Sequence, residues 1–381
     1  DHIIFLIYIL IISSSTIGYG FIFSKLINKE YLKLNIGYQG LFGFLFLVII
    51  SSISSFFFKH DYLHNLILQI IGLIAFVYYF YSITKKDKLL FGLIFFLILI
   101  SIYVYKNHDD FPYYHLTYAL TLTENKFVIG LGNLGHGFRT FSSLFYFHSI
   151  LYLPFIDQFL FHLGPFLILL FFNFIVVKKI FSYLYKKKEI SFILFFCLFS
   201  FSFVNIAFYR IAEHGTDRSP QIIIFLVFII LFEILFQNKD LRKKTIYFET
   251  FLILLVLASS LKALYYIYVA ILPLILTKYF FKFKIYKKIN YKITIPILIG
   301  LSLNLIINFL NTGCLLYPET KSCFNTKWSI PVEEVSDMKI HYEWWAKAGG
   351  GPGYEHELGK KDYVKKFNWT QNWIDKHFFN K

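Results

Sequence analysis

Long apolar runs recur along this chain, and they limit it to one kind of fold. Each run is roughly 17–25 residues long, the length that a helix needs to cross the hydrocarbon core of a bilayer. Of the 381 residues, 57% are hydrophobic and only 16% are charged, so polar side chains are too few to cover that many apolar helices in water. The sequence therefore predicts an all-α fold, a polytopic bundle of transmembrane helices.

We expect about ten passes through the membrane. The predicted spans are residues 3–23, 41–58, 63–83, 89–105, 157–177, 190–209, 220–237, 247–261, 263–277 and 293–311. Lysine and arginine concentrate in loops that face the cytoplasm. The loops assigned to that side are residues 25–33, 85–88, 178–188, 239–244 and 278–292. These loops explain the net charge of +15, which therefore indicates membrane orientation and not nucleic-acid binding.

The orientation of the loops depends on one turn near Lys262. A single pass over residues 247–277 would place the basic loop that follows it outside the cell. We therefore expect two short passes, with an external hairpin tip that carries Lys262. The alternative is one long tilted helix with an intramembrane lysine.

The predicted spans divide the chain into four segments. Residues 1–105 and 157–311 form membrane helices, residues 106–156 form an external loop with interfacial helices, and residues 312–381 form a polar external segment. The chain begins with an aspartate and its end carries no stop signal of a domain, so we expect that both ends are truncated. The polar clusters of interest all fall on the external face.

The most distinctive of these clusters is residues 106–115, KNHDDFPYYH, which follow an apolar run. Pro112 suits the first turn of a helix, and residues 113–124 read as an amphipathic helix on the membrane surface. Asp109 and Asp110 precede that helix, so one of them is a possible N-cap. Capping needs one aspartate, whereas this motif holds two between two histidines. We therefore interpret both aspartates as catalytic candidates.

A second cluster is the glycine-rich loop at residues 130–139, GLGNLGHGFR. It contains the pattern G-x-G-x-x-G, but no βαβ unit surrounds it, so it does not indicate a dinucleotide site. A flexible turn between surface helices is one interpretation. The other is a substrate-binding loop in which backbone amides, Asn133, His136 and Arg139 contact a phosphate or a sugar.

A third cluster, residues 210–220, concentrates ionisable side chains in a short loop, RIAEHGTDRSP. It is either a solvated loop or part of the site. In the second interpretation the loop supplies four substrate-binding residues, Arg210, Glu213, Asp217 and Arg218. Two more, His115 and Lys262, come from elsewhere in the chain. Guanidinium groups suit phosphate oxygens, and a lysine near the interface either extends to water or pairs with a lipid phosphate.

The same clusters contain the side-chain types that bind hard divalent cations. Oxygen ligands and imidazole suit Mg²⁺ or Mn²⁺. The candidate ligands for a divalent cation are His108, Asp109, Asp110 and His214.

The cysteines indicate a disulfide outside the cytoplasm. Cys314 and Cys323 follow the last predicted span and lie nine positions apart. They lack the C-x-x-C spacing of a metal site, so we expect a disulfide. Cys197 lies within a span and reads as a packing residue. Further on, residues 360–376 resemble an interfacial amphipathic helix.

An external Asp-Asp pair after a membrane span, leading into surface helices, resembles the GT-C superfamily of polytopic glycosyltransferases. The resemblance covers residues 89–323 as architecture and depends mainly on Asp109 and Asp110. In that superfamily the acidic motif usually follows the first span, whereas three further spans precede it here. The chain also looks like bacterial envelope membrane proteins that carry a Gly-Leu-Gly-Asn loop, here residues 130–133, and a Gly-Cys-x-x-Tyr-Pro segment, here residues 313–318.

The resemblance implies transfer of a sugar from a polyprenyl-phosphate donor to a glycan, lipid or protein acceptor. The reaction would take place at the periplasmic or extracellular face of a bacterial inner membrane. Asp109 or, preferably, Asp110 would be the base, and no nucleic acid would take part. The residues that would hold the departing phosphate are Lys262, Arg210, Arg218 and Arg139.

Other functions share this arrangement. The first alternative is a lipid-linked glycan polymerase or ligase, which would use the same external face. The second is a flippase or transporter without glycosyl transfer, for which polar residues and broken helices are expected at mid-membrane. The third is a structural subunit of an envelope complex.

Overall fold

The computed structural model describes residues 2–104, 107–185, 192–237, 240–282, 284–351 and 354–379. The fold is all-α apart from one small hairpin. Within the described residues, seven helical stretches are long and apolar enough to cross a membrane. They are His2–Ile27, Ile36–Ser55, Tyr62–Ser82, Gln158–Tyr185, Arg218–Phe236, Leu241–Leu261 and Tyr291–Thr312. The all-α class is confirmed, and these helices support a membrane protein; the count of ten passes stays a prediction.

The chain forms two compact units. Unit 1 comprises Asp1–Phe127 and Phe141–Asn304, and unit 2 comprises Val128–Thr140 and Leu305–Lys381. The glycine-rich loop therefore folds with the C-terminal residues and not with the rest of the segment 106–156. Hydrophobicity marks where a chain enters a membrane but does not show which loops pack together.

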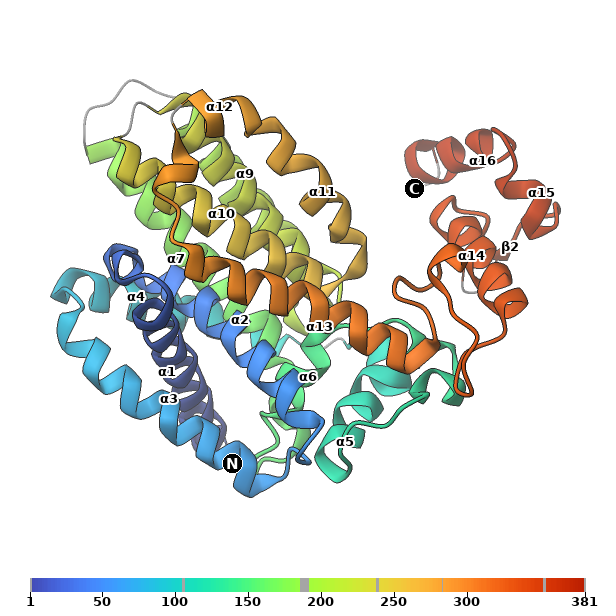
Figure 1. The fold of residues 1–381 in the computed structure, drawn as a ribbon, viewed down its shortest axis with the longest axis horizontal. Coiled ribbons are helices and arrows are strands. Elements are labelled where there is room, and N and C mark those ends of the chain that lie inside the picture. Colours follow the sequence, from blue (N-terminus) through green and yellow to red (C-terminus); the bar gives the residue numbers. More distant parts are fainter. Residues whose placement is uncertain are drawn as a thin grey trace. The chain divides into compact units, whose positions relative to one another are not determined.

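Unit 1 is a bundle of helices (Figure 1). Its helices are α1 (His2–Ile27), α2 (Ile36–Ser55), α3 (Tyr62–Ser82), α4 (Lys85–Leu99), α5 (Leu116–Glu124), α6 (Ser143–Ser149), α7 (Leu163–Tyr185), α8 (Phe192–Ala207), α9 (Arg218–Phe236), α10 (Leu241–Leu261), α11 (Tyr266–Ile275) and α12 (Thr277–Lys282). Helix α13 (Thr294–Thr312) runs from unit 1 into unit 2. The short helical turns of unit 1 are η1 (Lys29–Lys33), η2 (Ile100–Tyr103), η3 (Phe111–His115), η6 (Gln158–Leu160), η7 (Ile211–Glu213), η8 (Ala263–Tyr265), η9 (Ile285–Lys287) and η10 (Tyr291–Ile293).

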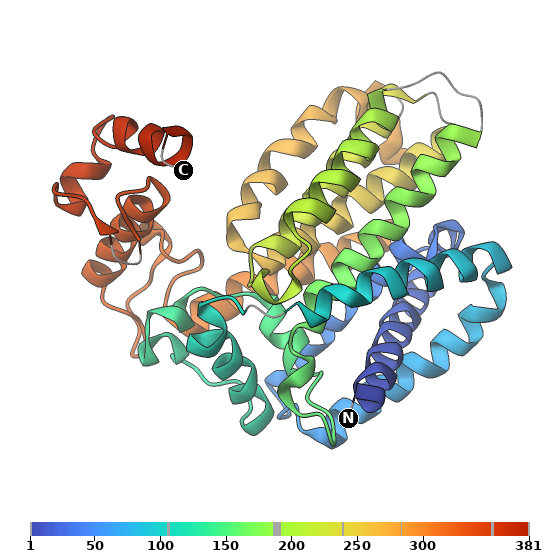
Figure 2. The same cartoon turned by 180° about the vertical axis from the view of Figure 1, so that it is seen from behind.

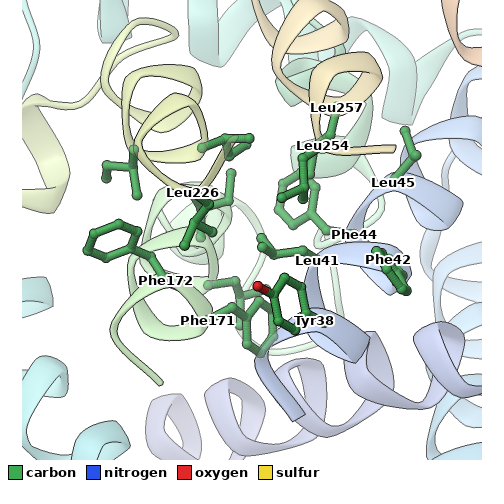
Figure 3. Packing of buried hydrophobic residues seen from close by; sticks show 14 of the residues in the cluster. Tyr38, Leu41, Phe42, Phe44, Leu45, Phe171, Phe172, Leu226, Leu254 and Leu257 are labelled. Atoms are coloured by element: carbon green, nitrogen blue, oxygen red, sulfur yellow. The ribbon is translucent and has the colours of Figure 1, made fainter. Parts of the chain in front are cut away.

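The core of unit 1 lies where α2, α7, α9 and α10 meet. Figure 3 shows Leu41 and Phe44 of α2 beside Phe171 of α7, with Leu226 of α9 and Leu254 of α10 close by. All five side chains are fully buried. Seen from behind, α7 and α8 run side by side along the same bundle (Figure 2). Aromatic and leucine side chains on several faces of each helix make this packing possible.

Helices α1 and α2 are in direct backbone contact. A Cβ added to Gly20 would lie 1.8 Å from the Gln39 carbonyl oxygen, and one added to Gly43 would lie 1.8 Å from the Thr16 carbonyl oxygen. No other residue fits at either position without moving the partner helix. Small residues at helix contacts are typical of membrane bundles, because they let two backbones approach closely.

Helix α10 ends where the sequence predicts a turn. Lys262 follows its last residue and has an extended backbone, with φ −150° and ψ 125°. The short turn η8 and helix α11 come next, and Pro273 lies inside α11. The alternative of one continuous long helix is therefore wrong, and two helical segments are present as predicted. Whether each of them crosses the membrane stays a prediction.

The loops with many lysines gather at one end of unit 1, which we name the basic end. Residues 186–188, 239 and 283 of these loops lie outside the described residues. Three contacts join the described parts: Arg242 pairs with Glu30, Lys178 pairs with Asp87 at 2.7 Å, and the Asn290 amide donates to the Ile27 carbonyl at 2.6 Å. Lys33, Lys178 and Lys243 also line one cavity, which links these contacts. Loops from all five predicted cytoplasmic segments therefore lie together, as a common membrane side requires.

The opposite end of the same helices carries the Asp-Asp motif, and we name it the motif end. Helix α2 begins at the basic end and finishes at the motif end, where the Ser55 carbonyl accepts from the Phe127 amide at 2.8 Å. Helix α10 finishes there too, and its Leu261 carbonyl accepts from the Ser142 hydroxyl at 2.6 Å. A helix of 21 residues such as α10 is about 30 Å long, close to the thickness of a bilayer core.

Unit 2 is small and partly irregular. Its elements are η4 (Leu131–Leu134), η5 (His136–Arg139), η11 (Thr320–Ser322), α14 (Val332–Ala346), β1 (Gly350–Gly351), β2 (Tyr354–Glu355), α15 (Lys360–Val364), α16 (Thr370–Ile374) and η12 (Asp375–Phe379). Strands β1 and β2 pair antiparallel. The prediction of one interfacial helix over residues 360–376 is wrong, because the chain turns between α15 and α16. Lys366 has φ 52° in that turn, a value that a continuous right-handed helix excludes.

Candidate functional site

The Asp-Asp motif opens a helical stretch that continues through η3 and α5. Pro112 lies in the first turn, as predicted. The side chain of Asp110 makes no capping hydrogen bond. Its Oδ2 accepts from the Tyr114 hydroxyl at 3.3 Å and lies 3.7 Å from His108 Nδ1. Capping therefore does not explain Asp110, whose side chain is 44% exposed and is oriented by the Tyr114 hydroxyl.

His108 connects the motif to the loop before α9. Its backbone amide donates to the Ala212 carbonyl at 2.9 Å, and its Nδ1 accepts from the Asp110 amide at 3.1 Å. Gly215 lies against its ring: a Cβ added there would be 2.9 Å from His108 Cδ2. Gly215 also has φ 50°, in the left-handed region that favours glycine. The glycine thus lets the two segments meet.

The loop before α9 holds its own charged residues in place. Arg210 donates to Glu213 at 2.8 Å and stacks on the neighbouring Tyr209 ring. His214 is buried, and its Nε2–H donates to the Phe208 carbonyl at 2.7 Å. Burial lowers the pKa of His214 to about 4, so this ring is neutral at neutral pH. Much of this cluster therefore supports the shape of the loop.

The two cations nearest the end of α10 and the start of α9 are less tightly held. Lys262 forms an ion pair with Asp217 and lies 3.4 Å from the Thr216 hydroxyl. Its side chain is 33% exposed. Arg218 is exposed and donates to Gln221 at 3.3 Å. These two cations can reach a ligand with little rearrangement.

Four histidines line a small cavity beside the motif, and two of them were not singled out in the sequence. They are His108, His115, His148 and His162. The cavity measures about 10 Å³, close to the space that one water molecule needs. The Nε2 atoms of His115 and His148 are buried and have no hydrogen-bond partner among the described residues. Burial, with His108 and Lys262 nearby, lowers the pKa of His115 to about 3.

The predicted metal ligands do not form a set. His214 uses Nε2 on a backbone carbonyl, and His108 uses Nδ1 on a backbone amide. Among the residues that the structure describes, no group of three or more His, Cys, Asp or Glu side chains is placed to hold a metal ion. The described residues therefore do not gather the predicted ligands, and the divalent cation stays a prediction.

The glycine-rich loop lies in unit 2, where its predicted substrate-binding residues are engaged in structure. Arg139 is buried, pairs with Glu334 at 2.8 Å and donates to the Gly132 carbonyl at 3.0 Å. The Asn133 amide donates to the Gly130 and Trp328 carbonyls. These contacts favour the interpretation of a structural turn.

The end of α13, directly before residues 313–318, packs on the glycine-rich loop. The Gly130 amide donates to the Leu310 carbonyl at 2.8 Å, and a Cβ on Gly132 would lie 2.7 Å from the Asn311 carbonyl oxygen. Cys314 and Cys323 form a disulfide in the same region. His136 is exposed on this unit. The glycine-rich loop and the end of α13 thus form one structural element, which we name the glycine element.

A family comparison covers nearly the whole chain. The family described as Domain of unknown function (DUF8201) matches residues 3–381. The chain belongs to this family. None of the curated proteins and none of the solved structures matches it. The DUF8201 match includes both units, so the histidine-lined cavity and the glycine element belong to a single family domain.

Sequence reasoning missed the residues that contact the motif from elsewhere in the chain. His148, His162 and Gly215 are each ordinary in their local sequence. The one available signal was Gly215, which stands between His214 and a polar run in a short loop. The histidines lie within or beside apolar helices, and only tertiary packing brings them to the motif.

Proposed function

We propose that this DUF8201 protein is a membrane glycosyltransferase that moves a sugar from a polyprenyl-phosphate donor to an acceptor hydroxyl at the outer face of the membrane. The observation that carries the proposal is the surroundings of Asp110. This half-exposed carboxylate faces His108 and Tyr114, at the same end of unit 1 as the cations Lys262 and Arg218. The basic loops lie at the opposite end, which favours an external motif end.

Asp110 would act as the general base. It accepts the proton of the acceptor hydroxyl while the hydroxyl oxygen bonds to the anomeric carbon of the sugar. The bond between that carbon and the phosphate oxygen breaks, and its electron pair leaves with polyprenyl phosphate. The Tyr114 hydroxyl orients the carboxylate. A base of this kind contributes about 10²–10⁴-fold to the rate. Asp109 is exposed next to it and is the second carboxylate candidate.

Positive charge near the departing phosphate would come from Lys262, Arg218 and Arg210. Negative charge grows on the phosphate as the bond breaks, and cations already in place stabilise it. Lys262 pairs with Asp217 in the resting protein, so the phosphate would replace Asp217 as its partner. Arg139 leaves this group of candidates, because its guanidinium is buried against Glu334 in unit 2.

The test is sugar transfer by purified protein in lipid. Radiolabelled polyprenyl-phosphate sugars would be supplied with a crude envelope acceptor. We expect Asp110→Asn to lower transfer by about 100-fold or more. Asp337→Asn, an equal change at an exposed position of unit 2, should leave transfer unchanged. Full activity of Asp110→Asn would remove the proposed base, and full activity of an Asp109→Asn/Asp110→Asn double variant would remove the proposed site.

A lipid-linked glycan flippase is the second candidate, and one observation favours it. A groove of about 450 Å³ runs between α4, α7 and α8 and is lined mostly by apolar side chains. Asn205 donates to Asn173 at 2.7 Å within it, and Asn173 lies near the middle of α7. Polar groups at that depth are typical of transporters. Saturable lipid-sugar binding without transfer, unchanged in Asp110→Asn, would favour this function.

A further inference from the structure

A cavity of about 900 Å³ lies at the basic end of unit 1, opposite the motif end. It is open to the outside and is bounded by η1, the start of α2, and the adjoining ends of α7, α8, α9 and α10. Four lysines line it: Lys33, Lys178, Lys179 and Lys243. Two carboxylates, Glu233 and Asp240, also line it, so the lining carries more positive than negative charge. A cavity of this size and charge suits an anion larger than a simple ion.

The wall of the cavity is held by a buried ion pair. Lys179 lies 2.6 Å from Glu233, and both residues are almost completely buried. The Tyr183 hydroxyl also donates to Glu233, at 3.4 Å. Burying two charges costs more free energy than a surface pair recovers, so such pairs often mark a functional position inside a membrane protein. This pair joins α7 to α9 and shapes the lysine-lined wall.

Two of the lysines are available to change partner. Lys33 pairs with Glu30 at 2.8 Å, and Lys243 pairs with Asp240 at 3.5 Å. Each is 67% exposed, and each partner is only three positions away in the sequence. Exposed pairs of this kind contribute little to stability. An anion in the cavity can therefore replace the carboxylates at little cost.

Apolar side chains beside the lysines point to an amphiphilic ligand. Phe192 at the start of α8 is 56% exposed, and Phe236 at the end of α9 is 66% exposed. Both line the same cavity as the lysines and belong to apolar helices. A soluble phosphate compound would leave these rings in water, whereas a lipid would cover them with its acyl chains while its phosphate meets the lysines.

We propose that this cavity binds the phosphate headgroup of an anionic membrane lipid. The site lies at the other end of the helices from the proposed catalytic residues, so it does not depend on the proposed function. Basic pockets between membrane helices on the cytoplasmic side are suited to such headgroups, because the anionic lipids of that leaflet supply the charge. Lys33 and Lys243 bind the headgroup directly, and Lys178 adds to the positive field.

The test is lipid binding by the delipidated full-length protein in neutral detergent, followed by native mass spectrometry. The titrants are phosphatidylglycerol, phosphatidylcholine and inorganic pyrophosphate. The pocket variant is Lys33→Gln/Lys243→Gln. The matched control is Lys29→Gln/Lys292→Gln, which removes the same charge from exposed positions at the same end that do not line the cavity.

The expected result is saturable binding of phosphatidylglycerol that is on the order of tenfold weaker in the pocket variant and within twofold of wild type in the control. Equal losses in the two variants would show diffuse attraction and overturn the proposal. Equal binding of phosphatidylcholine would do the same. Binding of pyrophosphate without a response to phosphatidylglycerol would overturn the lipid assignment in favour of a soluble phosphate. Unchanged thermal unfolding of both variants confirms that the comparison is between folded proteins.

Discussion

Glu249 offers a test of the fold that does not depend on any proposed function. Its side chain is fully buried in α10 and accepts three hydrogen bonds. The donors are the Tyr31 hydroxyl at 2.8 Å, the Asn28 amide at 3.0 Å and the backbone amide of Asn290 at 2.8 Å. One carboxylate thus joins α10 to two separate loops of the basic end.

The hydrogen bonds of Glu249 rank three substitutions by their expected loss in the free energy of unfolding. Glu249→Ala leaves one buried donor and two part-buried donors without an acceptor. Each buried loss costs roughly 1–3 kcal/mol before relaxation. We expect a net loss of about 3–5 kcal/mol in the free energy of unfolding. Glu249→Gln keeps one acceptor oxygen but places its NH₂ group against a hydrogen-bond donor. Its loss in the free energy of unfolding should therefore be about half that of Glu249→Ala. Tyr31→Phe removes a single hydrogen bond and should cost about 1 kcal/mol.

The chain itself provides a separate probe for each unit. Cys197 is the free cysteine and is fully buried in α8, so its labelling by a thiol-reactive dye on heating reports the opening of unit 1. All five tryptophans lie in unit 2, so their fluorescence reports that unit. Glu249→Ala should lower the midpoint of dye labelling far more than that of tryptophan fluorescence.

The control for this prediction is Glu30→Gln. Glu30 lies at the same end and pairs with the exposed side chains of Lys33 and Arg242. Because surface pairs contribute little, its loss should stay below about 1 kcal/mol. If Glu249→Ala were no more harmful than Glu30→Gln, the buried hub would not stabilise unit 1 and the reasoning would be refuted.

Three further predictions use the same two probes. Gly215→Ala should destabilise unit 1 by about 1–2 kcal/mol, because its φ is 50° and a Cβ would meet a histidine ring at 2.9 Å. In the control, Gly92→Ala, the added Cβ has nothing within 4 Å, so the change should be neutral or stabilising by up to about 1 kcal/mol. Equal midpoints of dye labelling in the two variants would contradict this prediction. Replacing Cys314 and Cys323 by serine should lower the free energy of unfolding of unit 2 by about 2–3 kcal/mol, measured by tryptophan fluorescence. An unchanged midpoint would show that other contacts hold the loop without the disulfide. Burial lowers the pKa of His115 to about 3, so its contribution to stability is complete above pH 6.5 and is lost as pH falls toward 3. His115→Gln should therefore reduce the pH dependence of the free energy of unfolding between pH 6.5 and 5 by up to about 1.4 kcal/mol per pH unit. An unchanged pH dependence would exclude a neutral buried ring.

Local chemistry explains the parts of the fold that were predictable. Apolar length predicts the membrane helices, and Pro112 predicts the start of the helix after the aspartates. Lys262 marks the end of α10, because a charge interrupts an otherwise apolar run. The positive-inside rule predicts that the basic loops share one side, and in the structure they lie at one end of unit 1. Each of these signals lies within a short stretch of sequence.

The candidate site was predictable only in part, for a related reason. The sequence singles out Asp110 and Lys262 by their unusual chemistry. It does not separate them from Arg139, which has the same kind of side chain but is buried against Glu334 in unit 2. A charge pattern cannot distinguish a ligand-binding cation from one that holds a loop. That difference depends on which carboxylate the fold brings near it.

By itself, the sequence determined the helical membrane class, the helix boundaries at Pro112 and Lys262, and the segregation of basic loops. The tertiary structure alone decided that residues 128–140 fold with the C-terminal unit, that Gly215 allows two loops to meet, and that Glu249 accepts hydrogen bonds from two separate loops. Membrane insertion depends on the transfer free energy of contiguous residues, which composition records. Contacts between residues far apart in the chain depend on packing, which a single sequence does not record.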